Sequence, residues 1–66
     1  MHMHSDMHEI FYIVKGEGNM VINGAEFPIQ GGDCVLVSAG DTHEIANTGD
    51  VDLVVCYFGV EEYRWL

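Results

Sequence analysis

The sequence predicts a single all-β domain over residues 1–66, either a barrel or a sandwich. Short apolar segments run the whole length of the chain, turn residues separate them at intervals of about 8 to 12 residues, and no helical pattern is evident. Six strands are expected, with a seventh at residues 2–4. The six cover residues 9–15, 19–22, 25–30, 33–37, 42–47 and 53–58.

Turn residues with special backbone preferences separate these segments. Asn23-Gly24 gives the clearest signal, because both residues tolerate the positive φ that a two-residue type I′ hairpin requires. Pro28 has no amide proton to donate to a neighbouring strand. The strand that contains Pro28 is therefore expected to be bulged or to lie at the edge of a sheet.

Two of the expected strands are apolar at nearly every position, which predicts that they are covered on both faces. These are residues 10–14 and 53–58. A chain of this length has a marginal core and cannot supply a second layer, so we expect a homodimer to provide the cover. Cys34 and Cys56 lie inside apolar runs and are expected to be reduced thiols in the core.

The charge balance limits the partners of the chain. Eleven acidic residues face two basic ones, Lys15 and Arg64, for a formal charge of −9. This charge repels phosphate backbones and anionic lipid surfaces, so neither nucleic acid nor a membrane is an expected partner. Because anionic ligands usually need an Arg or Lys, a neutral or weakly polar small molecule fits better. No membrane span or signal peptide is evident, which predicts a cytoplasmic location.

Histidines and a glutamate near the N-terminus have a spacing that can bind a metal. His2 and His4 are two residues apart, so in a strand they share a face and lie about 6.6 Å apart along the chain. Glu9 is an odd number of residues further on and would face the other way in an unbroken strand. Residues 5–7 must therefore contain a turn or bulge if the three side chains are to converge.

Two patterns in the chain resemble the motifs of the cupin superfamily. The first cupin motif ends in a pattern like His2-x-His4, four residues, Glu9, six residues, Gly16. The second motif is similar to Gly32, five residues, Ser38-x-Gly40, two residues, His43, three residues, Asn47. One departure is Ser38, which replaces a proline of the family; we expect this to loosen the turn without affecting a ligand.

The resemblance implies a jelly-roll β-barrel that binds one divalent transition metal through His2, His4, Glu9 and His43. Three imidazoles and one carboxylate suit Fe, Mn, Ni, Cu, Co or Zn and leave one or two coordination positions open. In cupins a strand and a glycine precede the first histidine, whereas this sequence begins at Met1. We therefore expect a compact or truncated form, or a partner chain that supplies the missing strand.

Several functions are compatible with such a site. The resemblance implies a metal-dependent enzyme, dioxygenase-like, that acts on a small neutral organic substrate, and it identifies no catalytic residue apart from the metal ligands. The alternative is a non-catalytic barrel that binds a metal or small ligand, with its interior filled by Phe11, Ile13 and Ile45. A third possibility is a metal that only stabilises the small fold.

Each of these residues also has a simpler interpretation. The first histidines could be a disordered start of the chain, Glu9 an ordinary strand residue and His43 a turn histidine; the motif spacing favours metal binding for all of them. His8 has no position in the motif, so we expect it to be exposed or to lie behind the ligands. Asn47 is expected to fix a turn.

Overall fold

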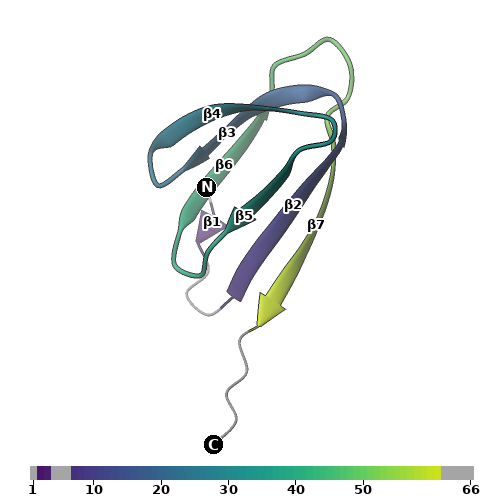
Figure 1. The fold of residues 1–66 in the computed structure, drawn as a ribbon. Coiled ribbons are helices and arrows are strands. Elements are labelled where there is room, and N and C mark those ends of the chain that lie inside the picture. The colour runs from purple at the N-terminus through teal and green to yellow at the C-terminus, as the bar shows by residue number, and fades with distance from the viewer. Residues whose placement is uncertain (1, 4–6, 62–66) are drawn as a thin grey trace, which may run out of the picture.

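The computed structural model describes residues 2–3 and 7–61 and the side chains of residues 7–60. It contains a four-stranded sheet of order β1-β6-β3-β4 and a three-stranded sheet of order β5-β2-β7 (Figure 1), and every pairing is antiparallel. The strands are β1 (His2–Met3), β2 (Met7–Lys15), β3 (Glu17–Ile22), β4 (Ala25–Gln30), β5 (Cys34–Val37), β6 (Thr42–Asn47) and β7 (Val54–Glu61).

All six strands predicted between residues 9 and 58 are confirmed; β4 and β6 have the predicted bounds, and the ends of the other four differ by at most three residues. The seventh, predicted at residues 2–4, corresponds to β1, although residue 4 lies outside the described part of the chain. Among residues 2–3 and 7–61, the structure contains no helix of the length and apolarity needed to cross a membrane.

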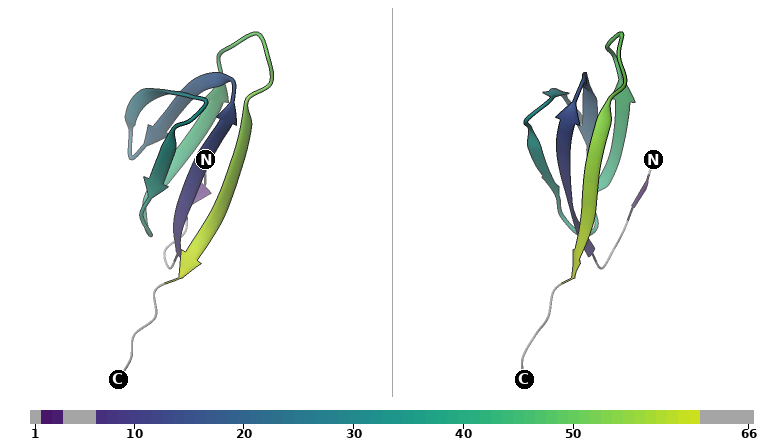
Figure 2. Two further views of the ribbon diagram at one scale, coloured as in Figure 1. Left: turned by 45° about the vertical axis from the view of Figure 1, so that its right-hand side comes forward. Right: turned by 90° about the vertical axis from the view of Figure 1, so that its right-hand side faces the viewer.

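The two sheets pack around a small apolar core, and Figure 2 shows them from two further sides. The core consists of Phe11, Ile13, Met20, Ile29 and Val37. These side chains come from β2, β3, β4 and β5, so both sheets contribute. A core of five buried apolar side chains agrees with the marginal burial expected for so short a chain.

The central strand β2 alternates between the core and solvent. Phe11 and Ile13 point inward and are buried, whereas Tyr12 and Val14 are 44% and 48% exposed. This is the two-residue period of a strand in which successive side chains take opposite faces. The outward positions Tyr12 and Val14 are apolar, as predicted, and remain exposed in the described part of the chain.

The prediction that both cysteines are buried is wrong, because Cys34 and Cys56 are exposed. Their Cα atoms both pair with that of Tyr12, one from β5 and the other from β7. Residues paired in this way share a face of the sheet, and here it is the outward one. A run that is apolar at every position does not reveal which of its faces is buried.

The turn predictions are confirmed. Ile22 pairs with Ala25, so Asn23 and Gly24 form a two-residue loop, with φ angles of 49° and 83°. Pro28 lies in β4, at the edge of the four-stranded sheet. In the described sheet β4 pairs with β3 on one side and with no strand on the other. The missing amide proton of Pro28 therefore deprives no neighbouring strand on that outer side of a hydrogen bond.

Candidate metal centre

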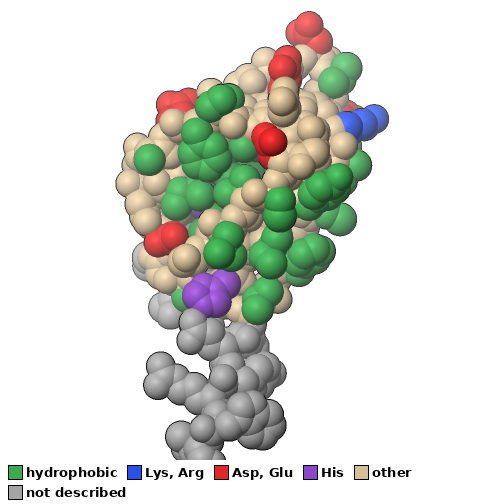
Figure 3. Space-filling model, viewed as in Figure 1, with side chains coloured by type: hydrophobic (Ala, Val, Ile, Leu, Met, Phe, Trp, Pro, Cys, Tyr) green, Lys and Arg blue, Asp and Glu red, His purple; other side chains and the backbone are tan. Residues whose placement is uncertain are grey.

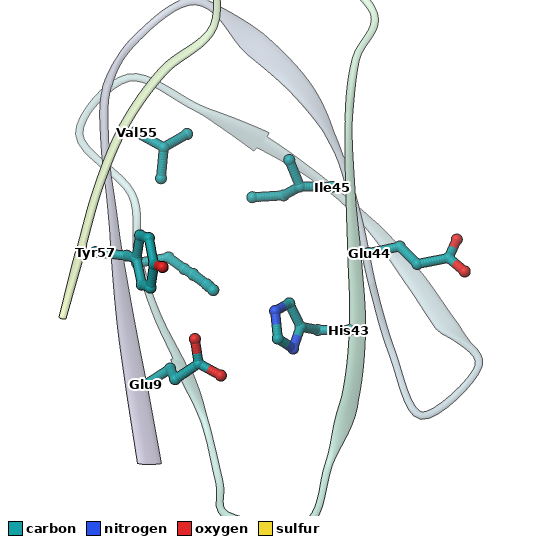
Figure 4. Close-up of a pocket in the computed structure, with 7 residues that line it drawn as sticks. Glu9, His43, Glu44, Ile45, Val55 and Tyr57 are labelled. Atoms are coloured by element: carbon teal, nitrogen blue, oxygen red, sulfur yellow. The ribbon is translucent and has the colours of Figure 1, made fainter. Parts of the chain in front are cut away.

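A cavity of about 540 Å³ lies between the two sheets (Figure 4). It is lined by Glu9 and Phe11 from β2, His43, Glu44 and Ile45 from β6, and Val55 and Tyr57 from β7. In the non-catalytic alternative, Phe11, Ile13 and Ile45 fill the interior of the barrel. Phe11 and Ile13 are buried, but Ile45 is 39% exposed and lines the cavity instead. The interior therefore has room for a small molecule.

Glu9 and His43 face each other across this cavity. Among the described side chains they are the buried polar ones, with 5% and 9% of their surface exposed. They come from different sheets, and Figure 4 shows both side chains directed into the space between the walls. Buried ionisable groups are normally paired, hydrogen-bonded or bound to metal. Carboxylate and imidazole are also donors that suit a divalent transition metal.

The backbone of β1 lies beside that of the strand that carries His43. The Cα of His2 pairs with the Cα of His43, and Met3 pairs with Thr42. His4 and residues 5–6, where we expected a turn or bulge, lie outside the described residues. The structure thus places the backbone of His2 next to that of His43. The side chains of His2 and His4 lie outside the described part of the chain.

Of the four predicted ligands, Glu9 and His43 are the two whose side chains the structure describes. Within residues 2–3 and 7–61, no group of three or more His, Cys, Asp or Glu is placed to hold a metal ion. A full site would therefore need His2 and His4 in addition to Glu9 and His43. The two donors described fit that role by type, by burial and by their convergence on one cavity.

Phe11 supports the imidazole from the core side. Its ring meets that of His43 edge-on, with centroids 5.2 Å apart and planes at 62°. On another side it meets Tyr57 in the same manner, at 5.4 Å and 79°. Edge-to-face pairs of this kind add roughly 0.5–1.5 kcal/mol beyond the burial of their area. The aromatic contact thus limits the positions that the His43 ring can take.

Asn23 fixes the backbone just before His43. Its side-chain oxygen accepts a hydrogen bond from the Thr42 amide at 3.0 Å, and its backbone amide donates to the Thr42 carbonyl at 3.0 Å. Its side-chain nitrogen donates to Asp41 Oδ1 at 2.8 Å. The sequence indicated Asn23 only as a turn residue, because a contact 19 residues along the chain leaves no local signal.

The Ser38 turn is better held than we expected from the loss of the proline. The Ser38 amide donates to Asp41 Oδ2 at 3.1 Å, and the Asp41 amide donates to the Ser38 carbonyl at 3.0 Å. Proline could not make the first of these bonds, because it has no amide proton. Asp41 therefore joins this turn to Asn23, and the two hold the start of β6 from both sides.

Two further polar residues hold loops and do not line the cavity. Asn47 accepts a hydrogen bond from the Gly49 amide at 2.9 Å and donates to the Val51 carbonyl at 3.0 Å, which confirms its predicted role in a turn. His8 is partly buried, and its Nδ1 accepts a hydrogen bond from the Ala39 amide at 2.9 Å. His8 therefore tethers the turn between β5 and β6, a role that its neighbours in sequence do not indicate.

We predict that Asn23→Gly lowers the free energy of unfolding by about 1–2 kcal/mol, because it removes the side-chain hydrogen bonds to Asp41 and Thr42, each worth roughly 0.5–1.5 kcal/mol. Glycine keeps the positive φ of the turn, so only the side-chain contacts change. Urea unfolding followed by circular dichroism measures the effect. The matched control is Asn19→Ala, which removes one exposed hydrogen bond to Glu26. Equal effects of the two substitutions would contradict the role of Asn23.

Comparison with known proteins supports the family that the motifs indicate. Residues 1–59 match the family model described as Cupin domain. The chain is 43% identical over 53 residues to a protein of Thermotoga maritima named oxalate-binding protein, which covers 80% of this chain and 44% of that protein. It is 33% identical over 55 residues to an uncharacterized protein of Methanocaldococcus jannaschii, covering 83% and 44% of the two chains.

A solved structure shows the same fold. The crystal structure of a predicted oxalate decarboxylase from Thermotoga maritima superposes with a TM-score of 0.89 at 38% identity, over 92% of this chain and 53% of that one. The chain thus spans about half the length of the relatives that it matches. The predicted cupin jelly-roll architecture is confirmed. From its family match, its motif spacing and its fold, the chain belongs to the cupin family.

Proposed function

We propose that this cupin binds a small carboxylate through one divalent transition metal held by His2, His4, Glu9 and His43. The observation that carries the proposal is the convergence of the buried Glu9 and His43, from opposite sheets, on one cavity. The motif spacing supports His2 and His4 as the remaining ligands. When bound, the metal supplies positive charge and open coordination positions for the oxygens of the ligand.

The charges around the cavity explain why the metal is needed. The described residues that line it include no Lys or Arg. The Glu9 carboxylate points into the cavity, whereas the Glu44 side chain points away from it (Figure 4). Without a metal, the Glu9 carboxylate would repel an anionic ligand. With a divalent ion on Glu9, the sign of the charge beside the ligand is reversed.

The proposed ligand is of a different chemical class from the one that the sequence predicts. The shortage of basic residues pointed to a neutral molecule, whereas a relative that is 43% identical is named oxalate-binding protein. A site-bound metal can replace the missing Arg or Lys, because it offers a carboxylate the positive charge that the side chains do not. Oxalate is therefore the first ligand to test.

The other side chains of the cavity would select for size. Phe11 and Val55 on one side and Ile45 on the other give the cavity apolar surfaces (Figure 4), and Tyr57, which also lines it, is 64% exposed. A cavity of about 540 Å³ falls within the range of roughly 300–1,000 Å³ that is usual for small-molecule sites. We infer that the ligand is small and enters from the Tyr57 side.

Isothermal titration calorimetry of the full chain with oxalate tests this proposal. The protein is titrated metal-free and after equilibration with one equivalent of Mn²⁺, and oxalate is titrated into Mn²⁺ alone to subtract its own chelation. Binding should be at least about tenfold tighter with the metal, which corresponds to about 1.4 kcal/mol. Equal affinity in both states, or binding of neutral diketones in preference to oxalate, would overturn the proposal.

The dioxygenase-like oxidation expected from the sequence stays a prediction. The room beside Glu9 and His43 favours it over a purely structural metal, which would need no open cavity next to it. Oxygen uptake by protein loaded with Fe, Mn, Ni or Cu, in the presence of small enols, phenols or diketones, is the measurement. No uptake with any of them would leave ligand binding as the function.

A further inference from the structure

Tyr57 lines the cavity, and neither the motif spacing nor the proposed metal ligands account for it. Its Cα pairs with that of Phe11, the next inward-facing residue of β2 after Glu9. Cross-strand partners share a side of the sheet, and a diagonal neighbour lies about 7–8 Å away, within reach of an aromatic side chain. Tyr57 and Glu9 therefore lie on the same wall of the cavity, opposite His43 (Figure 4).

The ring of Tyr57 is positioned by Phe11. The two rings meet edge-on, with centroids 5.4 Å apart and planes at 79°, and Phe11 also meets the ring of His43 in this way. Phe11 is itself buried in the core, where side chains are closely packed. One fixed side chain thus contacts both the Tyr57 ring and a proposed metal ligand, so it limits how far apart these two groups can move.

Tyr57 also supplies a hydrogen-bond donor that an anionic ligand needs. The other charged or polar side chains among the described lining residues are Glu9, His43 and Glu44. The first two are proposed metal ligands, and the Glu44 side chain points away from the cavity (Figure 4). An ionised carboxylate only accepts hydrogen bonds, whereas a phenol hydroxyl can donate one. Of the described side chains that line the cavity, Tyr57 therefore remains to donate to a bound carboxylate.

Oxalate has more oxygen atoms than one metal ion takes up when it is chelated. It binds a metal through one oxygen of each carboxylate, which leaves an outer oxygen on each. An acceptor that leaves water without finding a donor weakens binding. Tyr57 is 64% exposed, so water can reach its hydroxyl before the ligand binds. Binding would exchange that water for a charged acceptor, which forms a stronger hydrogen bond than a neutral one.

We propose that the Tyr57 hydroxyl donates a hydrogen bond to an outer oxygen of the bound carboxylate, and so selects ligands that carry an oxygen beyond those on the metal. This inference rests on the proposed function, because it requires a carboxylate bound at the metal. It adds to the site a residue of β7, a strand that carries none of the four proposed metal ligands. The motif spacing gives no signal for Tyr57, because the second motif ends at Asn47.

Tyr57→Phe tests the proposal, because it removes the hydroxyl and keeps the ring that meets Phe11. The matched control is Tyr12→Phe, which makes the same change on the opposite side of the same sheet, where Tyr12 is 44% exposed. Figure 3 shows hydrophobic side chains gathered over the strands of this sheet, β5, β2 and β7. The control thus removes a hydroxyl from the same sheet without changing the cavity.

The full chain and both variants are loaded with one equivalent of Mn²⁺, and elemental analysis gives the metal that each retains. Isothermal titration calorimetry then measures the binding of oxalate and of acetohydroxamate, with titrations into Mn²⁺ alone as blanks. Acetohydroxamate, like oxalate, chelates a metal through two oxygens in a five-membered ring, but it has no outer oxygen. The pair of ligands therefore separates a contact with the outer oxygen from an effect on the metal or on the cavity.

We expect Tyr57→Phe to bind oxalate at least about fivefold more weakly than the parent, because a hydrogen bond to a charged group is lost. Its affinity for acetohydroxamate should change by less than about twofold, because that ligand offers no outer acceptor. Tyr12→Phe should match the parent with both ligands, and all three proteins should retain the same amount of Mn²⁺.

Equal oxalate affinity in the parent and in Tyr57→Phe would overturn the role of Tyr57 and leave the proposed function standing. An equal loss of affinity for both ligands, or a loss of Mn²⁺ from Tyr57→Phe, would also overturn it, because Tyr57 would then act on the metal site or the shape of the cavity. If the metal-loaded parent does not bind oxalate, the proposed function is wrong and the role of Tyr57 is wrong with it.

Discussion

His43→Ala should reduce the metal content of the purified chain from about one equivalent to near zero. His43 is buried and faces the cavity opposite Glu9, so its loss removes one donor of the proposed four and leaves a gap that no described side chain fills. Residues that merely support a ligand cost about 10–100-fold in metal affinity, so loss of a ligand should cost at least about 100-fold. Elemental analysis of the parent and the variant, purified and loaded identically, measures this.

His8→Ala is the matched control, because it removes the same side chain on the other side of β2, next to Glu9. It should keep the metal and lose about 1 kcal/mol of stability with the hydrogen bond to Ala39. Glu9→Gln should behave like His43→Ala. If His43→Ala keeps its metal, the proposed site is wrong; if all three variants lose metal equally, binding depends on the fold or on the number of histidines and not on a defined ligand set.

The strands could be predicted because their signals are local. A two-residue loop needs positive φ at both positions, and Asn23-Gly24 supplies it, which also sets the register of β3 against β4. Pro28 predicted an edge strand for the same kind of reason, since a missing amide proton restricts its own strand. Such constraints act within a few residues, so they hold whatever the rest of the fold is.

The faces of the strands could not be predicted where both faces are apolar. The apolar runs around Cys34 and Cys56 predict core positions, whereas both residues are exposed. A shift of one residue in register exchanges the two faces of a strand, and an all-apolar run has no polar position to fix the choice. Glu9 is informative for the opposite reason: its charge at an inward position of β2 indicates a site and not a core.

The candidate site was predicted in part. Motif spacing identified Glu9 and His43, and the structure places both on one cavity, although no spacing could show that they come from opposite sheets. The hydrogen bonds that Asn23 and His8 accept from Thr42 and Ala39, in the segments before His43, could not be predicted because they join residues far apart in the chain. Local chemistry is readable from sequence, whereas the contacts that position it depend on the complete fold.

Ile13→Ala should unfold much of the metal-free chain at 25 °C. Ile13 has no exposed surface, and truncation of such a side chain costs about 2–5 kcal/mol. A domain of this length has a total stability of only about 3–10 kcal/mol. Ile13 does not line the cavity, so the proposed metal ligands are unchanged. Urea unfolding followed by circular dichroism gives the loss, and Val51→Ala, at a position that is 63% exposed, should change stability by less than about 0.5 kcal/mol.

Metal should restore part of this stability, because an ion that binds only the folded chain shifts the equilibrium by mass action. At a free metal concentration 100 times its dissociation constant the gain is about 2.7 kcal/mol, enough to refold a variant at the lower end of the expected loss. The same concentration should stabilise His43→Ala by at most about 0.4 kcal/mol, because its affinity is expected to be at least about 100-fold weaker. If the urea midpoint of Ile13→Ala does not change when metal is added, the ion does not stabilise the folded chain. That result would contradict the proposed metal centre.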